Sequence, residues 1–372
     1  MDRSNPPHPW LADRTIHFDG SGIRRIFDLA ATLKDPVNLS IGQPHFDVPE
    51  AIQEAATEAI TTGRNGYSAT AGIVPLREKL QSVLDRQFGH ADRRVMVTSG
   101  TSGGIVLAMM ALVNPGDEIL IFDPYFVMYQ PLIQAVGGTP VLIDTYPDFA
   151  IDLGKIEAAV TDRTKLILVN NPNNPTGQMT PVNQIEALAE LAKQKNIILL
   201  SDEIYKSFCY DESFTSPALF NSQTIVVDGF SKTYGITGWR VGFVHGPTQI
   251  IEAMARIQPF TFVCAPQPAQ WAATTALDID MSHAVDAYRQ KRDHLVESLS
   301  GHYAFSPPGG AFYLFPQVPQ GTATDFVARA IEKNLLIIPG GVFSQRDTHF
   351  RISFAVSDNT LQRGIDILRR LA

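Results

Sequence analysis

Residues 165–205 read KLILVNNPNNPTGQMTPVNQIEALAELAKQKNIILLSDEIY and contain a complete strand–helix–strand pattern. The apolar runs Lys165–Val169 and Ile197–Ser201 are short and do not alternate with polar residues, which is typical of strands buried on both faces. Between them, Thr180 and Pro181 suit the N-cap and N1 positions of a helix whose apolar residues recur at helical spacing. Such alternation predicts a mainly parallel α/β sheet with helices on both sides.

The same pattern continues on both sides of this stretch. Five more apolar runs are candidate strands: Val95–Thr98, Glu118–Phe122, Pro140–Ile143, Thr224–Val227 and Val241–Val244. A helix is expected over Glu50–Thr62, where Pro49 precedes it and Gly63 follows it. The sequence therefore predicts a large α/β domain, residues 46–282, built on a seven-stranded, mainly parallel sheet flanked by helices.

The character of the sequence changes after this domain. A charged helix is expected over His283–Leu299, followed by Gly/Pro-rich turns and the short strands Ala311–Phe315 and His349–Phe354. A final amphipathic helix is expected over Leu361–Leu371. We expect a smaller α+β domain formed by residues 283–372, to which the N-terminal arm, residues 1–45, returns.

The composition excludes several classes of protein. The chain has 372 residues, of which 44% are hydrophobic and 18% charged, and its formal net charge of -8 argues against nucleic acid or an anionic membrane as a partner. Cys209 and Cys264 lie far apart without the spacing of metal ligands, which indicates a reducing compartment and no metal site. The N-terminal residues lack the apolar core of a signal peptide, and Ile105–Val113 is too short to span a bilayer. We expect a cytoplasmic protein.

Candidate ligand-binding residues follow four of the expected strands, at the edge where α/β sheets bind ligands. They are the Gly-rich turn Ser99–Gly104, the aromatic residues of Asp123–Phe126, the Asn-Pro-rich loop Asn170–Gly177 and the acidic turn Asp202–Tyr205. Taken alone, each has a simpler interpretation: an ordinary turn, aromatic core packing, a rigid loop or a capping carboxylate. Since all four simpler interpretations would have to hold together, we infer one shared site.

A lysine in the turn after another expected strand completes this set. Residues 227–240 read VDGFSKTYGITGWR and place Lys232 eight positions before Arg240. An amine nucleophile close to a fixed cation suggests a Schiff base to an anionic aldehyde, of which pyridoxal phosphate (PLP) is the common one. The Gly-rich turn opens a helix whose N-terminus would bind the phosphate. Asp202 would pair with the protonated ring nitrogen, because a buried carboxylate is costly without a cation.

The motifs NNPNNPTG, SDEIY, SKTYGITGWRVG, PPGGAFY and RISFA are highly specific in combination. Through them the chain resembles, over nearly its whole length, the class I aminotransferases of fold type I, the aspartate aminotransferase-like group. The resemblance implies PLP as the cofactor, a homodimer with shared active sites, and catalytic roles for Lys232, Asp202 and Tyr205. It further implies phosphate contacts from Thr101, Ser102, Arg240 and, across the subunit boundary, Tyr67; ring contacts from Phe126, Asn174 and Tyr205; and substrate carboxylate contacts from Arg351, Asn174 and Gly42.

The reaction that this resemblance implies is transfer of an amino group from an L-amino acid to a 2-oxo acid, 2-oxoglutarate in particular, with ping-pong kinetics. Arg351 would bind the α-carboxylate in a fork, and Lys232 would move the proton from Cα. One alternative is a PLP-dependent lyase, of the β C–S lyase or aminocyclopropane-carboxylate synthase type, which begins with the same proton removal. Another is a PLP-binding homologue without catalysis, although every catalytic position is filled.

Two positions depart from the pattern of this family. Gly229 stands where many relatives have a phosphate-binding serine, for which Ser231 is a candidate replacement. Ser102 stands where aspartate-using bacterial relatives often have a lysine that meets the distal carboxylate. Burying an unpaired carboxylate costs several kcal/mol. We therefore expect a neutral or aromatic donor, unless Arg24 or Arg25 supplies the missing charge.

Overall fold

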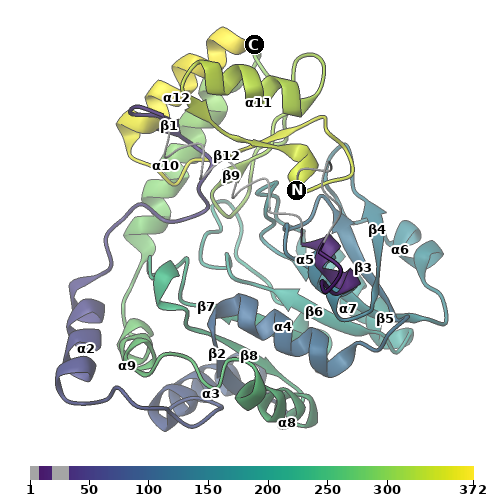
Figure 1. Ribbon diagram of the computed structural model, residues 1–372, viewed down its shortest axis with the longest axis vertical. Helices are drawn as coiled ribbons and strands as arrows, with labels where there is room; N and C mark the ends of the chain where they lie inside the picture. Colours follow the sequence, from purple (N-terminus) through teal and green to yellow (C-terminus); the bar gives the residue numbers. More distant parts are fainter. Residues whose placement is uncertain (1–7, 19–32) are drawn as a thin grey trace.

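Seven strands form the central sheet of the computed structural model, which describes residues 8–18 and 33–372. They are β2 (Arg94–Thr98), β3 (Glu118–Asp123), β4 (Thr139–Asp144), β5 (Thr164–Asn170), β6 (Ile198–Asp202), β7 (Ile225–Gly229) and β8 (Gly242–Gly246). Their spatial order is β2-β8-β7-β6-β5-β3-β4, and β8 runs antiparallel to both of its neighbours (Figure 1). The seven predicted strands and the mainly parallel sheet are confirmed, with bounds that differ by one or two residues.

Helices cover both faces of this sheet. One face packs against α4 (Gly100–Leu112), α5 (Tyr129–Ala135) and α8 (Thr248–Ile257). The other packs against α3 (Val74–Phe88), α6 (Leu153–Ala159), α7 (Val182–Gln194) and α9 (Gln267–Ala276), with α2 (Glu50–Thr61) lying on α9. In β5, Leu166 and Leu168 join the first cluster and Ile167 and Val169 the second. A strand covered on both sides has no polar face, which explains its continuous apolar sequence.

The predicted start of α7 is wrong by one position. Pro181 is the N-cap residue of this helix rather than N1, with an extended backbone at φ -57° and ψ 149°. Thr180 lies one residue before this N-cap, and its backbone N–H donates to Asn171 Oδ1 at 2.9 Å. This bond fastens the Asn-Pro-rich loop to the entry of α7.

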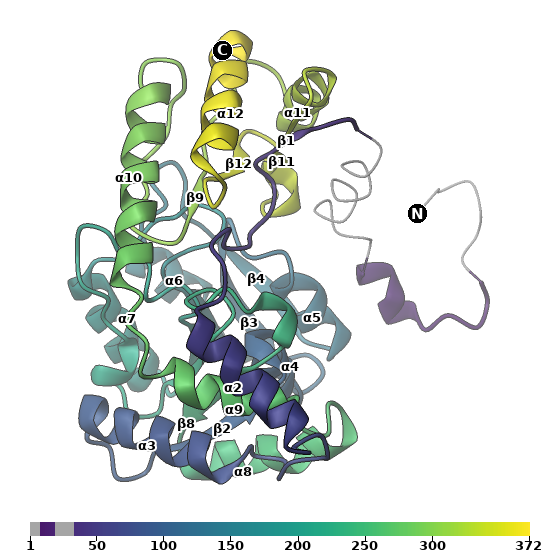
Figure 2. The same cartoon turned by 90° about the vertical axis from the view of Figure 1, so that its left-hand side faces the viewer.

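A second, smaller group of elements lies above one edge of the large sheet in Figure 1. It contains the parallel pair β1 (Val37–Asn38) and β10 (Leu335–Leu336), and an antiparallel sheet of β11 (Ile338–Pro339), β12 (Phe350–Ser353) and β9 (Tyr313–Leu314). The helices α10 (Ser282–Leu299) and α12 (Asp358–Leu371) pack side by side next to α11 (Ala323–Glu332) (Figure 2).

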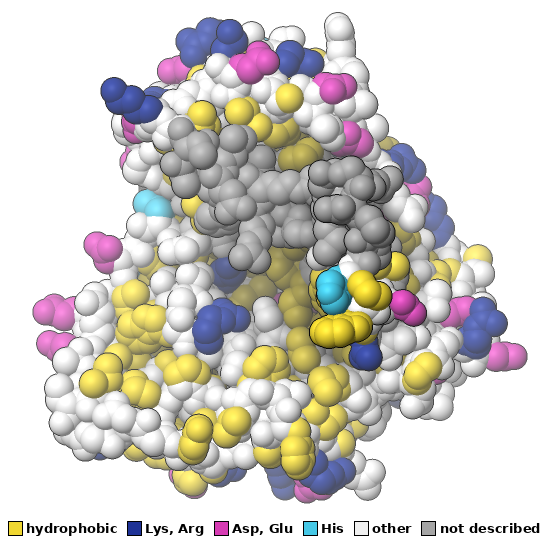
Figure 3. All heavy atoms as spheres, viewed as in Figure 1, with side chains coloured by type: hydrophobic (Ala, Val, Ile, Leu, Met, Phe, Trp, Pro, Cys, Tyr) yellow, Lys and Arg dark blue, Asp and Glu magenta, His cyan; other side chains and the backbone are white. Residues whose placement is uncertain are grey.

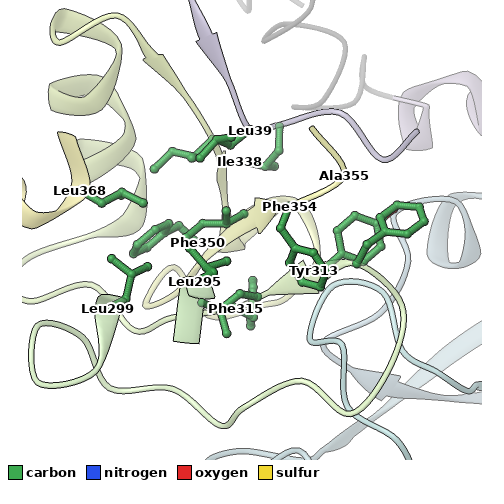
Figure 4. Packing of buried hydrophobic residues seen from close by; sticks show 14 of the residues in the cluster. Leu39, Leu295, Leu299, Tyr313, Phe315, Ile338, Phe350, Phe354, Ala355 and Leu368 are labelled. Atoms are coloured by element: carbon green, nitrogen blue, oxygen red, sulfur yellow. The ribbon is translucent and has the colours of Figure 1, made fainter. Parts of the chain in front are cut away.

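One apolar cluster holds this smaller group together (Figure 4). Leu295 and Leu299 of α10 and Leu368 of α12 meet Phe350 and the neighbouring strands there. Val37 of β1 and Leu39, which follows it, are buried in the same cluster, so this part of the chain packs with the smaller group before the large sheet begins. Among the described residues, none of the helices has the length and hydropathy needed to cross a membrane.

Candidate active site

A cavity of about 300 Å³ opens where the carboxyl ends of the central strands face the smaller sheet. Its lining includes eleven of the twelve residues selected from the sequence: Gly42, Thr101, Ser102, Phe126, Asn174, Asp202, Tyr205, Ser231, Lys232, Arg240 and Arg351. The exception is Tyr67, which is 86% exposed in the segment between α2 and α3. Arg24 and Arg25 lie outside the described residues. One edge of the sheet therefore collects side chains from segments far apart in the sequence.

Asp202 is the last residue of β6 and is only 4% exposed. The Tyr129 hydroxyl donates to its Oδ2 at 2.7 Å, and the Ile204 N–H donates to its Oδ1 at 3.3 Å. Burial raises the pKa of Asp202 to about 6, against the lowering effect of these two hydrogen bonds. Such a carboxylate gains most from a ligand that brings a positive charge.

Lys232 brings the amine into the cavity from the turn that follows β7. Its Nζ donates a hydrogen bond to the Gly42 carbonyl at 2.5 Å. Burial, together with the charges of Arg351 and Arg240, lowers the pKa of Lys232 to about 8. About a tenth of the amine is therefore unprotonated at pH 7, far more than for an ordinary lysine, and the unprotonated form is what a nucleophile or a proton acceptor requires.

Arg351 comes from β12, in the smaller sheet, and is 2% exposed. Its Nη1 donates to Asn174 Oδ1 at 2.9 Å, and its Nη2 donates to the Ser40 carbonyl at 2.7 Å. The guanidinium lies over the rings of Tyr313 and Phe343, at 4.5 and 4.6 Å from their centroids. Because each terminal nitrogen has two hydrogens, one N–H on each is left over, and the pair can bind a carboxylate in a fork.

The N-terminus of α4 forms the part of the cavity suited to an anion. Ser99 precedes this helix without capping it, so the first-turn amides keep their donor capacity. Thr101 Oγ1 is buried and has no hydrogen-bond partner among the described residues. A buried hydroxyl without a partner costs free energy, so a phosphate oxygen fits this position. Ser231 and Arg240 reach the same cavity from the turn after β7.

The structure gives a physical reason for Gly229. A Cβ atom at this position would lie 3.0 Å from Thr101 Oγ1 and 3.1 Å from the Gly242 Cα. The serine that many relatives have here would therefore crowd the hydroxyl of Thr101. In this chain Thr101 occupies the space, and Ser231 lines the cavity two residues later.

Three side chains that hydrogen-bond to the selected residues were not themselves selected from the sequence. The Tyr313 hydroxyl lies 2.8 Å from that of Tyr205, and Tyr129 supports Asp202 as described. Asn170 Oδ1 accepts the Asn174 N–H at 2.8 Å, and its Nδ2 donates to the Asp202 carbonyl at 3.0 Å. Tyr313 ends the PPGGAFY motif and Asn170 begins NNPNNPTG, so both stood within recognised motifs. Tyr129 carries no signal of its own in the sequence.

A buried lysine and carboxylate at the strand ends of the central sheet, together with an arginine from the smaller sheet, form the arrangement expected of an aminotransferase of fold type I. The sequence pattern of the family described as aminotransferase class I and II matches residues 34–368, and the chain belongs to this family, which uses PLP.

Similar proteins cover nearly the whole chain. The aspartate aminotransferase of Pyrococcus abyssi is 34% identical over 97% of this chain and 98% of its own length. The aromatic-amino-acid aminotransferase 2 of Thermococcus litoralis matches at the same identity and coverage. The structure of the Thermus thermophilus aspartate aminotransferase with maleate aligns with a TM-score of 0.93 and 32% identity, covering 97% of this chain and 99% of that one. The chain is thus similar to transaminases that differ in their substrate.

Proposed function

We propose that this aminotransferase holds PLP in the cavity and moves the amino group of a neutral or aromatic L-amino acid to 2-oxoglutarate. The observation that carries the proposal is the convergence of Lys232, Asp202 and Arg351 on one cavity. The orphan hydroxyl of Thr101 beside the α4 N-terminus supports a phosphate there.

The chemistry of each part of the cavity suits a different part of this cofactor. Thr101, Ser102, Ser231 and Arg240 would hold the phosphate, and Asp202 would hold the protonated ring nitrogen. Phe126 offers a ring for stacking, and Asn174 and Tyr205, whose Nδ2 and hydroxyl lie 3.5 Å apart, offer donors to the ring hydroxyl. Bound PLP supplies an aldehyde that condenses with amines and a ring that withdraws electrons from the substrate Cα.

The remaining work falls to the side chains of this chain. Arg351, with Asn174 held on its Nη1, binds the α-carboxylate and so fixes the orientation of the Cα–H bond. Lys232 Nζ, with its lowered pKa, would accept the proton from the substrate Cα and would then donate it to the carbon of the cofactor that carries the amino group. The amino acid leaves as a 2-oxo acid before the second 2-oxo acid binds, which predicts ping-pong kinetics.

The direct test follows each half-reaction alone. Purified enzyme is mixed with single amino acids in the absence of a 2-oxo acid, while the cofactor absorbance and the released product are measured. The proposal requires a stoichiometric 2-oxo acid with retention of nitrogen on the enzyme. Continuous release of ammonia would instead indicate a lyase.

We propose two domains: a large one that holds the cofactor and a small one that supplies the arginine for the substrate carboxylate. The large domain comprises residues 46–282, and the small domain comprises residues 283–372 with the arm 1–45. In support, the central sheet lies within residues 94–246, whereas Arg351 comes from β12.

The donor preference should be visible in kcat/KM. The cations that line the described cavity are Lys232, Arg240 and Arg351, and each already has a proposed role. The lining also includes the apolar side chains of Ile41 and of Ile105, which follows Ser102 by three residues on α4, and this suits an uncharged side chain. We expect phenylalanine to exceed aspartate by about tenfold or more, since an unpaired buried carboxylate costs upwards of about 1.4 kcal/mol.

The measurement compares aspartate with phenylalanine, methionine and alanine. The matched variant Ser102→Lys adds a cation at the cavity wall and should raise kcat/KM for aspartate selectively. A lead of aspartate by about a hundredfold, equivalent to about 2.7 kcal/mol, would contradict the preference and bring Arg24 or Arg25 into the pocket.

The proposed assembly is a homodimer in which Tyr67 completes the site of the neighbouring subunit. Tyr67 is 86% exposed, and Phe260, between α8 and α9, is 89% exposed. Figure 3 shows the face of the molecule seen in Figure 1. Apolar side chains lie over the lower half of this face, in the region of α4, α8 and α9. Exposed apolar surface of this kind is typical of an interface.

Subunit exchange tests the shared site. Tyr67→Ala and Lys232→Ala variants should each be nearly inactive, and a mixture should recover about a quarter of wild-type activity, because each mixed dimer regains one of its two sites. Each variant mixed with itself is the control. A fully active monomer at micromolar concentration, or a mixture that stays inactive after exchange, would contradict the shared site.

A further inference from the structure

A second cluster of buried charged groups lies behind the site and does not line the cavity. It comprises Arg93, Glu203, Lys206, Asp228 and His245, of which all but Lys206 are fully buried. Asp202 lines the cavity, whereas the adjacent Glu203 accepts a hydrogen bond from Ser216 Oγ at 2.6 Å. The carboxylate of Asp202 therefore faces the cavity, whereas that of Glu203 lies in the second cluster.

Lys206 and Asp228 form the ion pair at the centre of this cluster. Lys206 Nζ lies 2.6 Å from Asp228 Oδ2, and Asp228 Oδ1 accepts the N–H of Gly229 at 2.6 Å. Gly229 is the last residue of β7 and begins the turn that carries Lys232. The ion pair therefore lies at the end of β7, directly before the turn from which the amine projects.

The cluster is electrically balanced when both of its acids are ionised. Arg93 and Lys206 are the cations, Glu203 and Asp228 are the anions, and burial keeps His245 neutral by lowering its pKa well below the usual value. Burial raises the pKa of Glu203 to about 7. Burial lowers the pKa of Lys206, but the charges of Asp228 and Glu203 outweigh it and raise the pKa overall. Lys206 is thus a fixed cation.

The remaining neighbours of Lys206 do not offer a substitute charge. Tyr234 is a neutral phenol near physiological pH, and burial raises its pKa further, to about 12. The ring of Phe243, on β8, lies with its centroid 5.8 Å from Lys206 Nζ. The negative charge of Asp228 also raises the pKa of Asp202, so this charge acts on the cavity. Without Lys206, the cluster would hold one cation, Arg93, against two anions, and its net negative charge would act on the site.

We propose that Lys206, paired with Asp228 behind the turn that carries Lys232, is a positioning residue that sets the electrostatic field and the orientation of the amine. The inference rests on the roles proposed above for Lys232 and Asp202. It assigns opposite electrostatic effects to the two members of one ion pair, and these effects cancel when both members are removed together.

The test compares Lys206→Met, Asp228→Asn and the double variant with wild type. The first readout is the pH midpoint at which the visible absorbance of the bound cofactor changes, which reports the proton at the lysine nitrogen. Lys206→Met exposes a negative field and should raise the midpoint by roughly half to one pH unit. Asp228→Asn should lower it by a similar amount, and the double variant should lie within about 0.3 units of wild type. Lys206→Arg, which keeps the charge, should leave the midpoint near that of wild type.

The second readout needs no cofactor. The rate at which acetic anhydride modifies Lys232 in the cofactor-free protein, followed by mass spectrometry against pH, should shift in the same order among the variants. Equal midpoints in all variants, or a double variant shifted as far as either single one, would overturn the proposal. If Lys206→Met does not fold, the midpoints of Asp228→Asn and of the double variant still test the proposal. If wild type itself shows no pH-dependent absorbance from a cofactor attached to Lys232, the proposed function fails instead.

Discussion

Replacing Lys232 with alanine should lower kcat at least about ten-thousandfold and leave the protein folded. Among the described residues that line the cavity, Lys232 is the one primary amine, and its pKa of about 8 leaves it able to accept a proton near neutral pH. The variant removes both the attachment point of the cofactor and the carrier of the Cα proton. Pre-steady-state kinetics with a single amino acid measure the loss, and circular dichroism checks the fold.

The matched control is Lys232→Arg, which keeps a cation of similar length but cannot condense with an aldehyde or give up its proton. It should be as inactive as the alanine variant. Borohydride reduction of wild type followed by peptide mapping identifies the attached lysine directly. A reduced adduct on any other lysine would show that the assignment is wrong.

Replacing Asp202 with asparagine should lower kcat/KM by about a thousandfold, equivalent to about 4 kcal/mol of transition-state stabilisation. The amide has nearly the same shape and can still accept the hydrogen bond from Tyr129, which lies 2.7 Å from Asp202 Oδ2. It carries no charge, so it cannot hold a positive charge on a bound ring, and this buried site excludes the water that would otherwise screen the difference.

The measurement combines kcat/KM with the dissociation constant of the cofactor. Asp123→Asn is the matched control, because Asp123 is a buried carboxylate at the end of β3, two strands away from β6 in the same sheet, and it does not line the cavity. Its activity should stay within about tenfold of wild type, as expected for a small structural change. A loss of less than tenfold in the Asp202 variant would remove that carboxylate from the mechanism.

Most of the residues that line the cavity could be predicted from the sequence, because parallel strands bring their carboxyl ends to one edge of the sheet. Lys232, Asp202 and Asn174 each follow a strand that is recognisable from its own residues, so their meeting requires only that these strands share a sheet. Arg351 and Gly42 were assigned through the family resemblance, and the cavity lining includes both. The exposed position of Tyr67 leaves its role with the proposed partner subunit.

The sequence by itself determined the strands, the helices between them and the chemical kinds of side chain at the sheet edge, because these depend on residues close together in the chain. The tertiary structure alone decided the contacts that depend on register and packing. They include Tyr129 on Asp202, Tyr313 on Tyr205, and Thr101 in the space beside Gly229. The pairing of Lys206 with Asp228 belongs with them, because it requires β6 and β7 to lie side by side with Asp202 opposite Val227. A local apolar pattern encodes which faces are buried, but the partner of a buried polar group is set only when distant segments pack.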